Sequence, residues 1–224
     1  MSLIQITTVL FRNKISPKEI PFFRGSMIRL SGDALLFHNH NADGFNYSYP
    51  LIQYKRIKGC AALVGINQGA EAIECLFGEK SCFSCQLGNR TVDMELVSIS
   101  SEKLFVCCDK SDNSYKISHW LPLNSENYQQ YLQADGLVAR IAMLEKILVG
   151  NILSFAKGVG IYFDFPVICR ILQLESPNLS FYKNVELMSF RAAFRCNISL
   201  PEYIGLGKSV SVNNGVITRI YSEC

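Results

Sequence analysis

Hydrophobic and polar residues alternate in short runs through the first hundred residues, which is typical of half-buried β-strands. Such runs predict strands at 3–10, 49–57, 60–66 and on both sides of the turn LGNR at 87–90. Two longer stretches have helical patterns instead, at 16–31 and 67–78. The first of these begins with Ser16 and Pro17, residues that favour a helix start. The resulting order, β-α-β-β-α-β with one extra hairpin strand, predicts an α+β ferredoxin-like domain with both helices on one face of an antiparallel sheet.

The second half repeats this alternation with the helices placed earlier. Strands are predicted at 103–109 and 114–123, helices at 125–134 and 136–158, and further strands from 166 to the C-terminus. A serine-rich stretch, SISSEK at 98–103, interrupts the strand pattern and suggests a boundary between two domains, 1–101 and 102–224. Two small sheets in tandem with a cleft for a ligand are therefore expected.

Composition narrows the class of protein. Of the 224 residues, 18% are charged and 49% are hydrophobic, so the chain is expected to fold rather than to be disordered. The net charge of +3 is too small for a histone-like protein, so a nucleic-acid site would have to be local. The start of the chain lacks the pattern of a secretory signal, and the helix at 136–158 contains internal charges that a membrane span would avoid. We therefore expect a cytoplasmic protein without a membrane partner.

The nine cysteines have irregular spacing and are expected to be reduced thiols. Cys82 and Cys85 form a CxxC pair, and Cys107 with Cys108 would be its partners in a zinc site. Adjacent residues are poorly suited to two positions of one tetrahedral ion, so cysteines on strands are the favoured interpretation and no metal is expected.

The stretch FHNHN holds His38 and His40. If it is extended, the two side chains share a face, and neighbouring imidazoles suit proton transfer near neutral pH. A plain exposed loop, or a metal site completed by Asp43 or His119, are alternatives that the residues leave open.

Aromatic and basic residues are interleaved after the histidines, including Tyr47, Tyr54, Lys55 and Arg56, as in surfaces that stack on unpaired RNA bases. On a strand, Tyr54 and Arg56 would face opposite to Lys55, so only one of these sets can face RNA. An edge strand with solvated cations would have the same composition.

Near the C-terminus, LPEYIGLGKSVSVNNG places Gly205, Gly207 and Lys208 in a loop where backbone amides and an ammonium group suit phosphate. This is not a Walker sequence, and a simple glycine turn is equally compatible with it.

Taken in order, FHNHN with GFNYSYPLIQYKRIKGCAALVGINQGAEAI, then LVGNILSFAKGVGIYFD, then LPEYIGLGKSVSVNNGVI resemble the Cas six family of CRISPR-associated endoribonucleases, in its type I-B branch. The resemblance implies two tandem ferredoxin-like, RRM-related domains with antiparallel sheets. It also implies cleavage of CRISPR repeat RNA without a metal or other cofactor, by attack of a ribose 2′-OH. His40 would then be the principal proton-transfer residue and His38 its partner, with Tyr47 and Lys55 positioning or neutralising the phosphate.

Lys157, Arg191, Arg195 and Lys208, with Gly205 and Gly207, are the RNA contacts expected on the same basis. Two departures from the family pattern weaken the expected grip on RNA: Ser48, where relatives are often basic, and Val212-Asn213-Asn214, where relatives have further glycines. An inactive relative that only binds repeat RNA, and a protein-interaction scaffold, are the alternative functions. An interference complex is a further partner implied by the resemblance, and both a monomer and a homodimer stay open.

Overall fold

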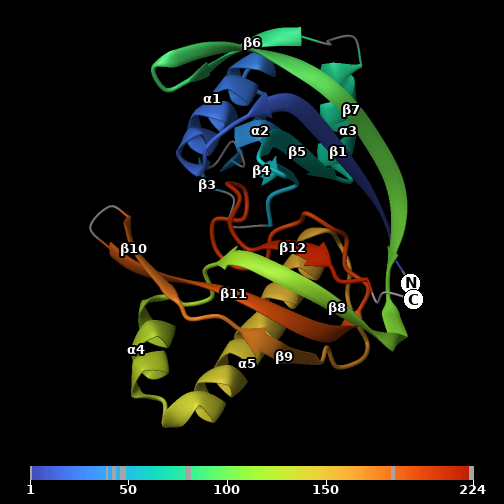
Figure 1. Cartoon of the computed structure of the whole chain (residues 1–224). Coiled ribbons are helices and arrows are strands. Elements are labelled where there is room, and N and C mark those ends of the chain that lie inside the picture. The colour runs from blue at the N-terminus through green and yellow to red at the C-terminus, as the bar shows by residue number, and fades with distance from the viewer. Residues whose placement is uncertain are drawn as a thin grey trace. The chain divides into compact units, whose positions relative to one another are not determined.

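The computed structural model describes residues 2–38, 40–41, 44–45, 49–78, 82–182 and 185–221 (Figure 1). The chain divides into two compact units. The N-terminal unit comprises Met1–Phe105 together with Ser211–Asn213, and the C-terminal unit comprises Val106–Val210 with Asn214–Cys224. A short segment near the C-terminus therefore belongs to the first unit.

The N-terminal unit follows the predicted order of strands and helices, with a short helix and two short strands added after the first helix that were not predicted. Its elements are β1 (Ser2–Lys14), η1 (Pro17–Glu19), α1 (Ile20–Leu30), α2 (Leu35–His38), β2 (His40–Asn41), β3 (Gly44–Phe45), β4 (Ile52–Ile57), β5 (Cys60–Ile66), α3 (Gln68–Phe77), β6 (Cys82–Leu87) and β7 (Arg90–Val106). The helix start predicted at Ser16 is present, and the Glu19 carboxylate accepts a hydrogen bond from the Ser16 backbone N–H at 2.7 Å.

The first sheet has the strand order β4-β5-β1-β7-β6. β5 lies between β1 and β4 and is antiparallel to both, which is the split β-α-β arrangement. Lys58 and Gly59, with φ of +50° and +89°, form the tight turn between β4 and β5, as the sequence predicted. This arrangement makes β4 the edge strand of the sheet.

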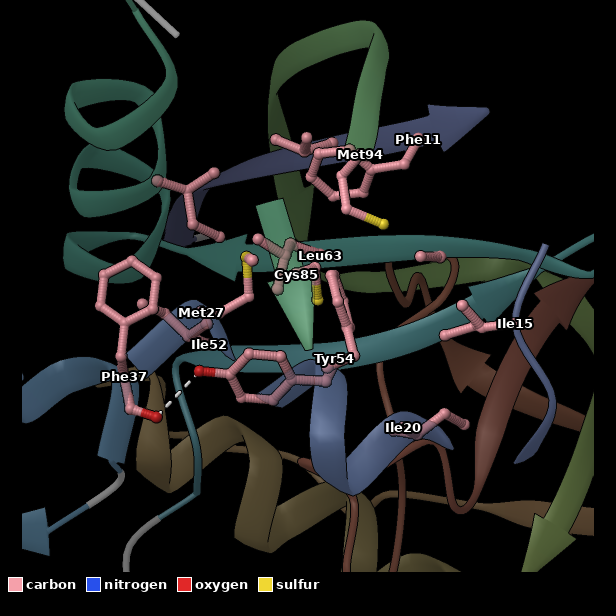
Figure 2. Packing of buried hydrophobic residues seen from close by; sticks show 14 of the residues in the cluster. Phe11, Ile15, Ile20, Met27, Phe37, Ile52, Tyr54, Leu63, Cys85 and Met94 are labelled. Carbon is pink, nitrogen blue, oxygen red and sulfur yellow. Dashed lines mark hydrogen bonds between the residues drawn. The ribbon is translucent and has the colours of Figure 1, made fainter. Parts of the chain in front are cut away.

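One face of this sheet packs on α1 and α3 through a cluster of buried hydrophobic side chains (Figure 2). Phe11 meets Phe23, Phe77 and Phe83 edge-on, with ring centroids 5.6 to 5.7 Å apart. Aromatic pairs in this geometry add to the stabilisation from burial alone. The cluster also takes in Phe37 from α2, so the histidine segment follows directly from the core.

The strand pattern does not pause at the serine-rich segment. β7 continues through 98–103 to Val106, and Ser101 bonds to the neighbouring strand β1 instead of ending the sheet. The Ser101 hydroxyl accepts from Thr7 Oγ1 at 3.2 Å and from Gln5 Nε2 at 3.3 Å. The two compact units meet in sequence between Phe105 and Val106.

The C-terminal unit contains a second sheet and two helices. Its elements are β8 (Cys108–Trp120), α4 (Ser125–Gln133), α5 (Gly136–Gly158), β9 (Cys169–Leu174), β10 (Asn178–Tyr182), β11 (Val185–Ile198) and β12 (Val216–Arg219). The strand order is β10-β11-β8-β12, and β9 also pairs with β11. Every pairing in this sheet is antiparallel, and α5 packs against β9 (Figure 1). Among the described residues, no helix is both long enough and apolar enough to cross a lipid bilayer.

Candidate functional site

The two histidines of FHNHN lie in different elements. His38 is the last residue of the short helix α2, and its Nε2 lies 3.4 Å from Asp33 Oδ1. His40 begins β2, where its backbone is opposite Phe45. The segment FHNHN is therefore not extended throughout. The prediction that the His38 and His40 side chains share one face depended on an extended backbone, so it does not follow from this structure. Asn39 and Tyr47, like Asp43 and Ser48, lie outside the described residues.

Two side chains hold the end of α2. Phe37 is buried with 3% of its surface exposed, and its carbonyl accepts a hydrogen bond from the Tyr54 hydroxyl at 2.9 Å (Figure 2). The carbonyl of His38 accepts from Nη2 of Arg24 on α1 at 2.6 Å. The last carbonyls of a helix have no partner within the helix, so these two donors satisfy groups that would otherwise be unpaired. Sequence reasoning assigned no role to Arg24 and considered Tyr54 only as a surface aromatic.

Strand β4 is buried on both faces. Tyr54 enters the core with 1% exposure, and Lys55, which points to the opposite side, has 0%. Burial lowers the pKa of the Lys55 ammonium group to about 7 and raises the pKa of the Tyr54 phenol. Tyr54 and Lys55 therefore point to opposite sides of the strand, as predicted. Because Lys55 is buried, it could contact an RNA phosphate only if its side chain rearranged.

The segment Ser211–Asn213 pairs with β4. Val212 is opposite Tyr54 in a parallel bridge, and the Tyr54 backbone N–H donates to the Ser211 carbonyl at 2.7 Å. The Asn213 Oδ1 accepts from the backbone N–H of Arg56 at 2.8 Å. Val212 also packs against the hydrophobic core of the N-terminal unit. Val212 and Asn213, which stand where relatives have further glycines, therefore have a structural role in pairing with β4. The backbone at Asn213 is left-handed, with φ of +66°, a conformation that asparagine tolerates.

The glycines of the C-terminal loop are needed for the loop's own packing. A Cβ on Gly205 would lie 2.6 Å from the Cβ of Val210, and one on Gly215, where φ is +62°, would overlap the Leu206 carbonyl. Gly207, with φ of +101°, faces the indole of Trp120. Lys208 Nζ donates to the Leu123 carbonyl at 2.9 Å, and partial burial lowers its pKa. The loop is thus internally fixed, with Lys208 exposed beside it.

The remaining predicted cations all belong to the C-terminal unit. Arg191 and Arg195 are exposed on the same face of β11, and Arg191 Nη1 lies 3.9 Å from a Glu175 carboxylate oxygen. Lys157 is exposed in the last turn of α5. Across the strands, Arg195 is directly opposite Arg170 on β9, which sequence reasoning missed because it did not give the register.

The CxxC cysteines point to opposite sides of β6. Cys82 is exposed, whereas Cys85 is fully buried, as alternation along a strand requires for residues three apart. This geometry does not bring the two thiols to one ion. The described residues contain no group of three histidine, cysteine, aspartate or glutamate side chains placed to hold a metal.

Comparison with solved structures gives the fold. The chain resembles a protein whose structure is described as the crystal structure of Cas6b, with a TM-score of 0.83 and 24% identity over 98% of this chain and 100% of that one. A second resemblance is to the CRISPR RNA processing endoribonuclease Cas6b, with a TM-score of 0.75 and 21% identity over 98% and 100% of the two chains. A type IV Cas6 crRNA endonuclease matches more distantly, with a TM-score of 0.54 and 10% identity. The prediction of an α+β protein with two tandem ferredoxin-like domains is confirmed.

Sequence comparison agrees with this. An uncharacterized protein of Methanocaldococcus jannaschii is 36% identical over 106 residues, which cover 46% of this chain and 69% of that protein. The family model for the Cas6b N-terminal domain matches residues 2–104, and the model for the Cas6b C-terminal domain matches residues 107–220. Nearly the whole chain is accounted for by these two models, and the resemblance stated from the motifs is confirmed: the chain belongs to the Cas6b family.

Proposed function

We propose that this protein is an endoribonuclease that processes precursor CRISPR RNA by cutting within its repeat. The observation that carries the proposal is membership in the Cas6b family across both domains, since a structurally similar member is described as a CRISPR RNA processing endoribonuclease. The histidine segment supports the same activity, because it supplies groups that transfer protons near neutral pH. The histidine segment begins at the end of α2, where Arg24 of α1 and Tyr54 of β4 donate hydrogen bonds to the last two carbonyls of the helix.

The proposed reaction needs no metal. A general base removes the proton of the ribose 2′-OH, the 2′ oxygen attacks the adjacent phosphorus, and the bond from phosphorus to the 5′ oxygen breaks. A general acid protonates the leaving 5′ oxygen. The products carry a 2′,3′-cyclic phosphate and a 5′-OH. We assign the principal proton transfer to His40 and the partner role to His38, with no assignment of which is acid and which is base.

Tyr47 and Lys55 are secondary candidates in this site. Tyr47 is proposed to position the scissile phosphate. Lys55 is buried and does not reach RNA directly. Its proposed role in neutralising the phosphate is therefore limited to the electrostatic effect of its charge at a distance. Tyr47→Ala protein that cuts at the wild-type rate in a single turnover would remove this residue from the site.

RNA contacts are proposed in the C-terminal unit. Arg191 and Arg195 present two guanidinium groups on the exposed face of β11, and guanidinium groups suit phosphate oxygens. Lys157 and Lys208 would add ammonium groups. One of the three N–H bonds of Lys208 is directed to the Leu123 carbonyl, so the side chain is already oriented. Gly205 and Gly207 would contribute by shaping the loop that carries Lys208.

The deciding experiment is cleavage of a labelled repeat RNA in EDTA. The same RNA with a 2′-deoxy nucleotide at the scissile position and the variant His40→Ala are run beside it, with His119→Ala as the matched histidine control. We expect wild-type and His119→Ala protein to cut, and cleavage to be lost with the deoxy substrate and with His40→Ala.

Two other outcomes would contradict the proposal. RNA that is retarded in a gel but not cut would indicate a relative that only binds repeat RNA, for which the altered loop at Val212–Asn214 is the favouring observation. RNA that is neither retarded nor cut would leave a protein-interaction scaffold as the function.

A further inference from the structure

The end of helix α2 depends on two residues of other elements. α2 has four residues, too few to be stable without tertiary contacts, and its last two residues are Phe37 and His38. Tyr54 from β4 and Arg24 from α1 donate to the carbonyls of these two residues. The backbone that leads from the core into the histidine segment is therefore fixed by side-chain donors at consecutive positions.

Tyr54 is well suited to fix this backbone. Its ring is buried and meets Phe23 edge-on, with centroids 6.1 Å apart and an interplanar angle of 86°. Its backbone pairs with Leu63 of β5 on one side and bonds to Ser211 on the other. A tyrosine has two rotatable side-chain bonds, and both are restricted here by packing. Because burial raises its pKa, the phenol stays protonated and remains a donor at neutral pH.

Arg24 on α1 supplies the second donor, and this donor is positively charged. Its Nη2 reaches the His38 carbonyl at 2.6 Å, a short distance that is typical of charge-assisted hydrogen bonds. Arg24 is adjacent to Phe23, on which Tyr54 packs, so the two donors are part of one packed group. A shift of this group would move the backbone from which the His38 side chain projects.

We infer that Tyr54 and Arg24 are positioning residues for His38, one of the two proposed proton-transfer histidines. They act by holding the carbonyls of Phe37 and His38, and they do not touch the RNA. The inference rests on the proposed function, because only a cleaving enzyme has a rate for these residues to affect. Misplacement of a reacting group by about 1 Å costs as much as 100-fold in rate, so loss of one of the two donors should be visible in cleavage.

The test compares Tyr54→Phe with Tyr115→Phe. Both substitutions remove one buried hydroxyl that donates to a backbone carbonyl, Phe37 in the first case and Leu200 in the second. The Tyr115 hydroxyl also accepts from the Leu200 backbone N–H at 2.7 Å, so the control loses one hydrogen bond more. Tyr115 lies in the C-terminal unit and reports the general effect of such a loss on stability. Arg24→Met and Arg24→Lys form a second pair, in which lysine keeps a cationic donor. Single-turnover cleavage of repeat RNA and its dissociation constant are measured for each variant.

For Tyr54→Phe and Arg24→Met we expect cleavage slowed by about 10-fold with RNA affinity within about twofold of wild type. Tyr115→Phe should cut at the wild-type rate, and Arg24→Lys should recover part of the loss. In spectra of protein with ¹³C-labelled histidine, the His38 signal should move in Tyr54→Phe while that of His119 stays in place. This last readout separates repositioning of the histidine from a general loss of stability.

Two results would overturn the inference while leaving the proposed function intact. One is a wild-type rate in Tyr54→Phe, and the other is an equal loss of rate in Tyr54→Phe and Tyr115→Phe. Wild-type protein that leaves the RNA uncut would overturn the proposed function first and the inference with it. The wild-type lane therefore distinguishes the two failures.

Discussion

Asn213 and Arg56 are joined by a hydrogen bond across 157 residues of sequence: the Asn213 Oδ1 accepts from the backbone N–H of Arg56 at 2.8 Å. The bond extends the pairing of Ser211–Asn213 with β4, an edge strand whose backbone groups would otherwise lack a neighbour on that side. The strand that carries Tyr54 is thus held from both sides, by β5 and by this segment.

The first prediction concerns Asn213. Asn213→Ala removes the acceptor and places alanine at a φ of +66°, so we expect the free energy of unfolding to fall by about 1 to 2 kcal/mol. Asn213→Asp keeps an acceptor oxygen and a residue that tolerates this backbone, and should lose less than half as much. Urea unfolding of the two variants beside wild type measures both values. An aspartate variant as unstable as the alanine variant would mean that the hydrogen bond to Arg56 contributes little.

The second prediction concerns the glycine loop. Gly215 combines a φ of +62° with a position where a Cβ would overlap the Leu206 carbonyl, so Gly215→Ala should lower stability by roughly 3 kcal/mol or more. Gly150→Ala is the matched control, because Gly150 lies inside α5 with no neighbour within 4 Å of the added carbon. There alanine should stabilise the protein by about 0.5 to 1 kcal/mol. Thermal unfolding of both variants checks the difference, and similar effects would contradict the packing role assigned to Gly215.

Local patterns were enough to predict the main strands and helices of the N-terminal unit, but not the short elements α2, β2 and β3. The strands at 3–10, 49–57 and 60–66 and the helix at 67–78 all have their counterparts in β1, β4, β5 and α3, because alternation and turn residues are properties of neighbouring positions. The pause in the strand pattern that was predicted at the serine-rich stretch has no counterpart in β7, for the same reason. A run of serines resembles a linker locally, whereas Ser101 is held in β7 by Thr7 and Gln5 from a distant part of the chain.

The candidate site depends more on tertiary contacts and was correspondingly harder to predict. Alternation placed Tyr54 and Lys55 on opposite sides of a strand, but it does not tell whether one side or both are buried. The pairing of Val212 with Tyr54 joins residues far apart in sequence and has no local signal. The helical conformation at His38 follows from the insertion of Phe37 into the core, which the polar context of FHNHN hides.

The third prediction concerns RNA affinity. If Arg195 contacts phosphate, Arg195→Ala should weaken binding of repeat RNA and reduce the slope of log affinity against log salt by about 0.7 to 0.9. Lys146→Ala removes one exposed positive charge from α5 and is the control for the change in net charge. Its slope should equal that of wild type. Binding isotherms at several salt concentrations provide the measurement, and equal slopes for the two variants would remove Arg195 from the RNA contacts.

The fourth prediction concerns Lys55 and pH. Burial lowers the pKa of Lys55 from 10.5 in a solvated lysine to about 7, so between these values the unfolded chain binds more protons at this position than the folded chain. Stability therefore rises with pH across that window, and the full cost of burying the charge is present below pH 7. Relative to Lys55→Met, which has no group to titrate, wild type should gain about 2 to 3 kcal/mol in free energy of unfolding between about pH 6 and pH 9.

Urea unfolding of wild type and Lys55→Met at the two pH values measures this gain, since subtracting the variant removes the titration of other groups. Lys146→Met controls for the loss of an exposed ammonium group and should follow wild type at both pH values. A difference between wild type and Lys55→Met that does not change with pH would mean that Lys55 keeps its proton in the folded protein. In that case its ammonium charge would be available at neutral pH, and the electrostatic role proposed for it in RNA cleavage would be strengthened.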